Sequence, residues 1–470
     1  VTKRFGKVIA NDSVNLTIEG GKVLCLLGEN GSGKTTLMNV LSGIYMPEQG
    51  HILKNGVEIQ IRSPKDAFAN GIGMIHQHFK LVDVLTVTEN IILGLKEKGK
   101  LNIRAAAQKI AAIYEKYGFD LDPMAKIYDL SVSQKQTVEI VKVLFRGAEI
   151  LILDEPTAVL TPQETDRLFQ VVRNMRADGK AIVLITHKLH EVLSVSDEVA
   201  VLRKGKYIGT VKTSEATAQS LTDMMVGRAV SLNIDRPDPV DPKPRLKIEG
   251  LTCVDNLGVK RLDDVTFTAM SGEILGIAGI AGSGQRELLE CITGLYPVEH
   301  GTVTFLPEGK PAQQLIGKTP NQIRKAGVAM AFVPEDRLGM GLVGSMGMGS
   351  NMMLRSWRKG KGAFVNRRDP NKLAMEVMEE LEVVTPSIST PVRRLSGGNV
   401  QKVLVGREIA MSPSVLLTAY AVRGLDINTS YTIYNLLTQQ KMKGSAVVYV
   451  GEDLDVLLEL CDRILVLCGG

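Results

Sequence analysis

Apolar and polar positions along this chain follow two patterns, short continuous apolar runs and longer stretches with apolar residues at helical spacing. The first strong run, residues 23–27, is followed by a glycine-rich turn and then by a helical pattern over residues 36–42. A second run, residues 149–153, ends in the carboxylates Asp154 and Glu155. Continuous leucine and β-branched runs of this length are typical of parallel strands buried on both faces. The pattern therefore predicts an α/β fold.

The stretch after these carboxylates predicts another helix and another strand. Thr161, Pro162 and Glu164 have the order of an N-cap, a first-turn proline and a capping glutamate. The next apolar run, residues 181–186, ends at His187. Strand, helix and strand form a βαβ unit, in which ligands bind beyond the carboxyl ends of the strands. We expect four polar side chains to share this rim: Lys34, Asp154, Glu155 and His187.

The glycine-rich turn matches a phosphate-binding loop. It reads Gly28, Glu29, Asn30, Gly31, Ser32, Gly33, Lys34, Thr35 and Thr36. Glycines let backbone N–H groups wrap a phosphate at a helix N-terminus, where the helix dipole also favours negative charge. We expect Lys34 to reach the β- and γ-phosphates and the Thr35 hydroxyl to ligate Mg²⁺. An ordinary glycine turn would not require lysine and threonine after its last glycine.

The two carboxylates suit hydrolysis of a bound phosphate chain. Asp154 can hold Mg²⁺ directly or through water, which leaves Glu155 to orient or deprotonate an attacking water. Gln77 could reach the metal or the water, and His187 could contact the γ-phosphate. Each of these last two also fits a satisfied structural group, because a lone glutamine or histidine carries little information by itself.

Several segments recur at nearly constant spacing, which indicates an internal repeat. The shift is 251 residues for Gly21 and Gly28, which recur as Gly272 and Gly279, and 265 residues for Ser131 and Asp197, which recur as Ser396 and Asp462. We expect a first domain over residues 1–228, a linker over 229–245 and a homologous second domain over 246–470. Four prolines within eight positions of the linker indicate a short, semi-rigid spacer.

Composition restricts the class of protein. With 470 residues, 44% of them hydrophobic and 23% charged, the chain fits a soluble globular protein of two or three domains. A net charge of +5 without a basic tract does not indicate a nucleic-acid partner. The five scattered cysteines indicate reduced core residues of a cytosolic protein. We find no membrane-spanning stretch and no signal peptide, and we expect the native protein to extend beyond both ends.

Residues 130–134 and 395–399 resemble the signature motif of ABC transporter ATPases, and the resemblance covers nearly the whole chain. It implies two tandem P-loop ATPase domains of the α/β class, each a mixed sheet with a helical subdomain, that use ATP and Mg²⁺. In this family the loop over residues 28–35 matches Walker A, Gln77 the Q-loop, Asp154 and Glu155 Walker B with its catalytic glutamate, and His187 the switch histidine. Phe5 lies where the family has an aromatic residue that stacks on adenine. Without the family, Phe5 would be interpreted as a core residue at a strand end.

Two fused domains with the motifs at residues 157–162 and 423–426 are similar to the ATPase subunits of bacterial sugar and nucleoside importers. Residues 73–79 and 333–343 are closest to the purine nucleoside branch. The resemblance implies an ATPase at the cytoplasmic face of the membrane, as a peripheral subunit. Its implied partners are transmembrane permeases and, through them, a substrate-binding lipoprotein or periplasmic protein. The cargo stays open among a nucleoside, a monosaccharide and another small solute such as a flavin.

The second half departs from this pattern at each chemical position. Gln285 and Arg286 replace Lys34 and Thr35, Ala419 and Tyr420 replace Asp154 and Glu155, and Glu335 and Glu452 replace Gln77 and His187. We therefore expect this half not to hydrolyse ATP. In the family each nucleotide lies between the Walker motifs of one domain and the signature of the other. The intact Walker set would face Ser396, Gly397 and Gly398, so that the halves pair within one chain and use one productive ATP per cycle.

Three classes of function remain at this point. The first is the motor subunit of an importer. The second is a soluble tandem ATPase that acts on ribosomes or DNA, which usually has two working sites and a long charged linker. The third is a nucleotide-binding regulator without turnover, against which Glu155 and His187 argue. In the family, a helix-rich insert that here includes residues 80–96 and 339–353 contacts the permeases, although glycine with methionine also fits a flexible loop.

Overall fold

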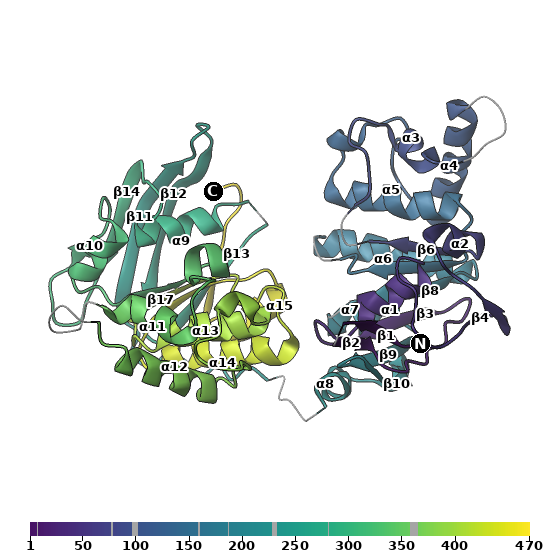
Figure 1. The fold of residues 1–470 in the computed structure, drawn as a ribbon. Helices are drawn as coiled ribbons and strands as arrows, with labels where there is room; N and C mark the ends of the chain where they lie inside the picture. Colours follow the sequence, from purple (N-terminus) through teal and green to yellow (C-terminus); the bar gives the residue numbers. More distant parts are fainter. Residues whose placement is uncertain are drawn as a thin grey trace. The chain divides into compact units, whose positions relative to one another are not determined.

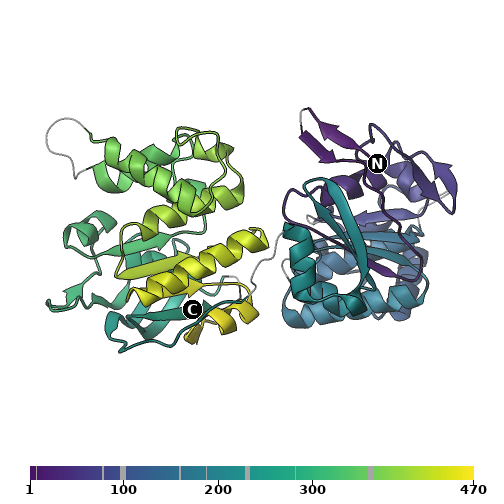
Figure 2. The same ribbon diagram turned by 90° about the horizontal axis from the view of Figure 1, so that it is seen from below.

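The computed structural model describes residues 1–6, 8–76, 79–95, 102–157, 160–186, 188–227, 233–280, 282–357 and 365–470. The chain divides into two compact units, residues 1–231 and 232–470, which Figure 1 and Figure 2 show from two directions. Residues 233–243, which include much of the proline-rich segment, contain no helix or strand. The finer domain boundaries at residues 228 and 246 stay a prediction.

The first unit is built on a six-stranded mixed sheet with the strand order β10-β9-β3-β8-β7-β6. Its strands are β3 (Val23–Leu27), β6 (Ile72–Ile75), β7 (Ile150–Asp154), β8 (Ala181–Ile185), β9 (Glu198–Arg203) and β10 (Lys206–Lys212). All of these pair in parallel except β10, which runs antiparallel to β9. Every residue of β3, β6 and β8 is buried, which explains their continuous apolar sequences.

Two antiparallel hairpins and eight helices complete the described part of this unit. The hairpins join β1 (Lys3–Phe5) to β2 (Val8–Asn11) and β4 (Ile52–Lys54) to β5 (Val57–Ile59). The helices are α1 (Lys34–Leu41), α2 (Pro64–Ala69), α3 (Val87–Ile92), α4 (Ile103–Tyr117), α5 (Val132–Phe145), α6 (Pro162–Ala177), α7 (Leu189–Val195) and α8 (Ala218–Val226), with 3-10 turns at Ile127–Asp129 and Thr213–Glu215. Figure 1 shows α3, α4 and α5 as a group apart from the sheet. Their buried side chains form a core of their own, as expected for a helical subdomain.

The second unit has a five-stranded parallel sheet with the order β16-β17-β18-β13-β19 and a four-stranded antiparallel sheet with the order β12-β11-β14-β15. Its strands are β11 (Pro244–Val254), β12 (Lys260–Met270), β13 (Glu273–Ala278), β14 (His300–Phe305), β15 (Gln313–Gln314), β16 (Met330–Val333), β17 (Val415–Ala419), β18 (Ala446–Val450) and β19 (Arg463–Val466). One apolar cluster joins both sheets, because it contains residues of β11, β13 and β14.

The described part of the second unit contains seven helices. They are α9 (Gln285–Thr293), α10 (Pro320–Lys325), α11 (Met348–Ser356), α12 (Arg368–Glu380), α13 (Gly397–Ile409), α14 (Ile427–Met442) and α15 (Leu454–Leu460), with a π-helical turn at Arg337–Gly341 and a 3-10 turn at Val392–Arg394. The helices α11 to α15 share a second apolar core with the parallel sheet.

Several local predictions are confirmed and others need correction. Thr161 and Glu164 form the expected capping box at the start of α6. The helix predicted over residues 36–42 begins two residues earlier, at Lys34. The interpretation of residues 339–353 as one loop needs correction, because they contain the end of the π-helical turn and most of α11, with a loop only over 342–347. Among the described residues, no helix is long and apolar enough to cross a membrane.

Candidate active site

The loop between β3 and α1 has a backbone that requires glycine at two positions. Gly33 has a φ of 99°, and a Cβ added there would lie 2.2 Å from the carbonyl oxygen of Ala10. A Cβ at Gly28 would lie 2.2 Å from the carbonyl oxygen of Leu202. The two glycines therefore allow the loop before α1 to pack closely against its neighbours, as the glycines of an anion-binding loop do.

The Lys34 ammonium lies over this loop. Its Nζ donates hydrogen bonds to the carbonyl oxygens of Gly28 at 2.7 Å and Glu29 at 3.0 Å. Burial lowers the pKa of Lys34, although the nearby carboxylates of Glu155 and Asp154 oppose this shift. The buried Ser32 hydroxyl has no hydrogen-bond partner within the described part of the chain. A bound phosphate would satisfy both the buried cation and this hydroxyl.

Two carboxylates stand beside the loop, at the carboxyl end of β7. Burial raises the pKa of Asp154, as does neighbouring Glu155, whereas a hydrogen bond with the Thr35 side chain opposes the shift. Thr35 and Asp154 thus lie in contact and offer oxygen ligands of the kind that Mg²⁺ prefers. Glu155 has a φ of 47°, and its N–H donates to the carbonyl oxygen of Ile185 at 2.9 Å. Left-handed backbone is uncommon outside glycine and often occurs at functional positions.

Gln77 and His187 lie outside the described residues, so their predicted positions are not tested. The neighbours of His187 are fixed to α7, because the Thr186 hydroxyl donates to the Glu191 carboxylate at 3.0 Å. The Lys188 N–H donates to the same hydroxyl at 3.1 Å, and Lys188 pairs with Glu191 at 3.1 Å.

Phe5 is exposed at the end of β1, with 45% of its surface accessible. Its ring meets Tyr45 edge to face, with centroids 5.2 Å apart, and the Lys3 ammonium lies 5.3 Å from the Phe5 centroid. The interpretation of Phe5 as a core residue is therefore wrong. The aromatic ring is available to a ligand, although adenine stacking stays a prediction.

The chain matches known proteins over both of its phosphate-loop units. The ABC transporter family matches residues 11–158 and 262–418. The chain belongs to this family. Its predicted ABC identity, its tandem α/β fold and its ATPase activity are thereby confirmed.

Curated ABC relatives align with the whole chain. It is 42% identical to a nucleoside import ATP-binding protein of Lactococcus lactis and 42% identical to a guanosine import ATP-binding protein of Bacillus subtilis, with 100% of this chain and 92% of each relative covered. A glucose import ATP-binding protein of Haloferax volcanii is 37% identical, with 100% of this chain and 90% of the relative covered.

A solved structure shares the tandem architecture of this ABC protein. An archaeal ribosome recycling factor, in complex with a ribosomal stalk protein, has a TM-score of 0.63 and covers 96% of this chain and 84% of its own. The two sequences are only 16% identical, so the likeness concerns the fold alone.

The second ABC domain keeps the scaffold of the loop and changes its chemistry. Gly284 has the same φ of 99° as Gly33. Gln285 follows it and donates from Nε2 to the carbonyl oxygen of Ile280 at 3.1 Å, so that an uncharged amide lies where the first domain has an ammonium. Ala419 ends β17 and provides no metal ligand. The sequence-predicted loss of chemical groups thus occurs on a preserved backbone.

Both ABC signature segments begin helices through a serine N-cap. The Ser396 hydroxyl accepts from the Asn399 N–H at 3.4 Å and from its side-chain amide at 2.9 Å, at the start of α13. Ser396 and Gly397 are exposed and Gly398 is half-buried, so this helix N-terminus is accessible. Ser131 caps α5 in the same way, with Gln134 completing a capping box.

The structure also shows relationships that the sequence interpretation missed. The Asn90 side chain bonds to both the N–H and the carbonyl oxygen of Val82, at 2.8 and 3.1 Å, and Asn351 does the same to Val343, at 2.8 and 3.2 Å. Both pairs are 261 residues apart, so a repeat search at this spacing would have found them. Arg423, which joins Glu335 and Glu452, had no such signal because the three residues lie in separate loops.

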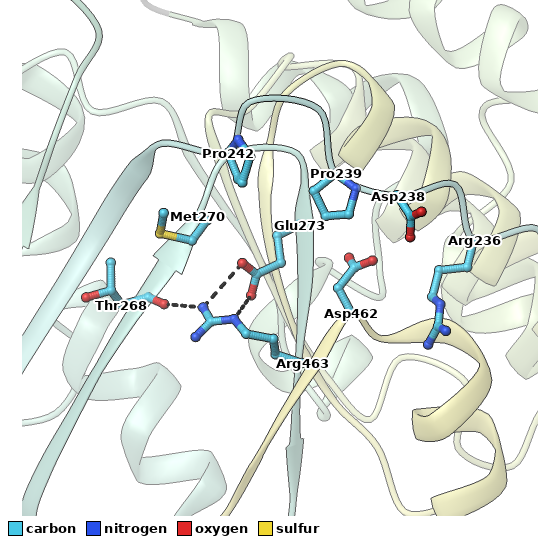
Figure 3. A pocket seen from close by; sticks show the side chains of 9 residues that line it. All are labelled: Arg236, Asp238, Pro239, Pro242, Thr268, Met270, Glu273, Asp462 and Arg463. Atoms are coloured by element: carbon cyan, nitrogen blue, oxygen red, sulfur yellow. Dashed lines mark hydrogen bonds and ion pairs between the residues drawn. The ribbon is translucent and has the colours of Figure 1, made fainter.

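A separate hollow of about 470 Å³ lies in the second unit, at the amino ends of the parallel strands β13 and β19 (Figure 3). Glu273 and Arg463, the first residues of β13 and β19, meet there through two hydrogen bonds of 2.8 and 3.2 Å. Arg463 also donates to the carbonyl oxygen of Thr268 at 2.7 Å. Because the second phosphate loop follows the opposite end of β13, this hollow is not part of the nucleotide site.

Proposed function

We propose that this chain is the ATP-hydrolysing subunit of a nucleoside importer, with one productive ATP site per chain. The proposal is supported by the residue types suited to phosphate and water in the first-domain sequence and by their replacement in the second-domain sequence. The nucleoside cargo is supported by 42% identity to two nucleoside-type relatives, against 37% to the glucose-type relative. A monosaccharide or another small solute such as a flavin is the alternative cargo.

In this proposal the first domain binds and cuts ATP. The phosphates lie on the backbone of residues 28–36, including Asn30, Gly31 and Thr36, and Lys34 pairs with the β- and γ-phosphates. Thr35, Asp154 and Gln77 hold Mg²⁺, which when bound would screen the phosphate charge. Glu155 takes the proton of the attacking water, a role typically worth about 10²–10⁴ in rate. His187 contacts the γ-phosphate.

The signature of the second domain completes this site in the proposal. Ser396, Gly397 and Gly398 approach the γ-phosphate through the accessible N-terminus of α13, where the helix dipole and the free N–H groups favour an anion. Glycine at residues 397 and 398 leaves room for that approach. Phe5 stacks on the adenine through its exposed ring. The proline-rich linker over residues 229–245 joins the domains at 1–228 and 246–470.

We further propose that matching loops in both domains contact the permeases. Asn90 and Asn351 shape these loops, which expose Val82 and Val84 in the first domain and Val343 and Met346 in the second. Exposed apolar side chains on both domains fit a partner with two similar halves. The chain would then lie at the cytoplasmic face of the membrane as a peripheral subunit, and a substrate-binding lipoprotein or periplasmic protein would act through the permeases.

Reconstitution tests the cargo and the function together. The chain is assembled in proteoliposomes with the permeases and binding protein encoded beside its gene, and phosphate release is measured with guanosine, ribose, glucose or riboflavin as the added solute. We expect guanosine to stimulate ATPase activity and the Glu155→Gln variant to show no stimulation. Stimulation by a sugar or by riboflavin, but not by guanosine, would show that this solute is the cargo instead of a nucleoside. Failure to assemble, with pelleting on ribosomes instead, would contradict the importer function.

A further inference from the structure

In the second domain a single guanidinium joins the two positions that correspond to the Q-loop and the switch histidine. Arg423 Nη1 lies 2.5 Å from Glu335 Oε1, and its Nε lies 3.0 Å from Glu452 Oε1. These carboxylates replace Gln77 and His187 of the first domain. Arg423 itself corresponds to an alanine, residue 158, at the shift of 265 that relates the two Walker B segments. The first domain therefore has no arginine at this position.

The three residues come from three neighbouring loops on one edge of the sheet. Glu335 follows β16, Arg423 follows β17 and Glu452 follows β18, each within four residues of the strand end. These strands are adjacent and parallel, so their carboxyl ends meet at the rim that also carries the second phosphate loop. The ion pairs thus link the loops that, in the first domain, would surround the metal and the terminal phosphate.

Further contacts hold Arg423 in place. Its guanidinium carbon lies 5.8 Å from the centroid of Tyr420, the residue at the catalytic glutamate position. The carbonyl oxygen of Arg423 accepts a hydrogen bond from the Arg337 guanidinium. About half of the Arg423 side chain, 51%, is accessible to solvent, but its guanidinium has directional contacts with two carboxylates and an aromatic ring.

The residues on this rim do not fit Mg²⁺. Ala419 and Arg286 stand at the positions of Asp154 and Thr35, so two of the three proposed oxygen ligands of the first domain are lost. The third position, that of Gln77, is occupied by Glu335. The two carboxylates that the second domain has gained already share the charge of Arg423. In the first domain this rim offers Thr35 and Asp154 as oxygen ligands, whereas in the second an arginine of the chain pairs with the rim carboxylates.

We propose that the Arg423 guanidinium replaces the divalent metal in the second domain and, together with Glu335 and Glu452, holds the three rim loops in place without a ligand. Arg423 thereby determines the specificity of this site against divalent metal. The proposal does not depend on the transported solute or on turnover in the first domain.

Hydrogen exchange of the full chain tests the role of Arg423 in ordering the loops. The reporter N–H groups are those of Tyr420, which donates to Val450, and of Leu338 and Gly339, which donate to the Asp336 carboxylate. We expect the same protection in wild type with EDTA or with Mg-ATP, and at least tenfold faster exchange in Arg423→Ala under both conditions. Arg423→Lys should retain part of the protection. Arg245→Ala, which removes the Arg245–Glu308 pair at 2.8 Å elsewhere in the unit, is the matched control and should leave these amides unchanged.

Manganese binding followed by electron paramagnetic resonance tests the replacement of the metal. With saturating ATP we expect one bound Mn²⁺ per chain in wild type, in Arg423→Lys and in Arg245→Ala. Arg423→Ala frees the carboxylates of Glu335 and Glu452 and should bind a second Mn²⁺. Two Mn²⁺ per wild-type chain, or no gain in Arg423→Ala, would overturn the proposal. Loop protection that appears only with Mg-ATP in wild type would overturn it as well.

Discussion

Glu155 and Tyr420 have the same backbone geometry in the two ABC domains. Their φ angles are 47° and 49°, and their N–H groups donate to the last residue of the neighbouring strand, Ile185 at 2.9 Å and Val450 at 3.0 Å. A left-handed backbone at a residue with a side chain costs free energy, yet both domains keep it. The difference between the domains at this position therefore lies in the side chain, a carboxylate in one and a phenol in the other.

Replacing these two side chains should have unequal effects on turnover. Glu155→Gln removes the proposed base while keeping the size of the side chain, so we expect kcat to fall by about 10²–10⁴. ATP affinity should change little. Tyr420→Phe removes a hydroxyl at the matching position and should leave kcat unchanged. Steady-state phosphate release and equilibrium ATP binding on both variants check this, and equal losses in the two would contradict a single catalytic site.

The two phosphate loops should differ in what their side chains contribute to binding. Lys34→Ala removes a charge-assisted hydrogen bond worth roughly 1.5–3 kcal/mol, so we expect ATP affinity at the first site to fall by about 10–150-fold. Gln285→Ala is the matched change in the second loop and removes only a neutral amide. Titration with a fluorescent ATP analogue measures both. A larger loss from Gln285→Ala than from Lys34→Ala would show that the second loop is the stronger site.

Asp154 should make the ligand-free protein less stable near neutral pH. Burial raises the pKa of Asp154, so the folded state binds this proton more tightly than the unfolded state does. The resulting stability is present while Asp154 is protonated and is lost as the pH rises through its raised pKa. Asp154→Asn removes this loss, and we expect Tm at pH 7 in EDTA to rise by about 2 °C or more.

Thermal unfolding of wild type and Asp154→Asn between pH 4 and pH 7 measures this effect. The control is Asp166→Asn on α6, whose side chain is not buried and which should leave Tm within a degree of wild type. A lower Tm for Asp154→Asn than for wild type at pH 7 would mean that the ionised carboxylate stabilises the ligand-free fold.

If the domains pair as proposed, replacing the two signature serines should have unequal effects on ATPase activity. Ser396 and Ser131 both cap helices, so replacing either by arginine should cost a similar amount of stability, about 1 kcal/mol. Ser396→Arg places a bulky side chain against the proposed productive site and should abolish ATPase activity. Ser131→Arg faces the altered site and should retain most of it. Unchanged activity in Ser396→Arg would rule out this pairing.

Much of the fold and the first phosphate loop could be predicted from the sequence, because their signals are local. Continuous apolar runs identified β3, β7 and β8, and the capping pattern at Thr161 and Glu164 identified the start of α6. Glycine spacing identified the loop before Lys34, because the backbone geometry of this loop requires glycine.

Features that depend on contacts between distant segments could not be predicted in this way. Arg423 and Glu335 are 88 positions apart in the sequence, and the three paired residues lie on three different loops. No local sequence pattern therefore indicates these ion pairs. The exposure of Phe5 follows from its place at the end of a hairpin beside Tyr45, which a strand pattern alone does not reveal.

Trapping of the product counts the sites of each chain that cut ATP, and we expect one. Purified full-length protein is incubated with radiolabelled ATP, Mg²⁺ and orthovanadate, and the ADP retained per chain is counted after gel filtration. We expect one trapped ADP per wild-type chain, a background amount in Glu155→Gln and the wild-type amount in Tyr420→Phe. Two trapped ADP molecules per wild-type chain, or one that persists in Glu155→Gln, would contradict this expectation.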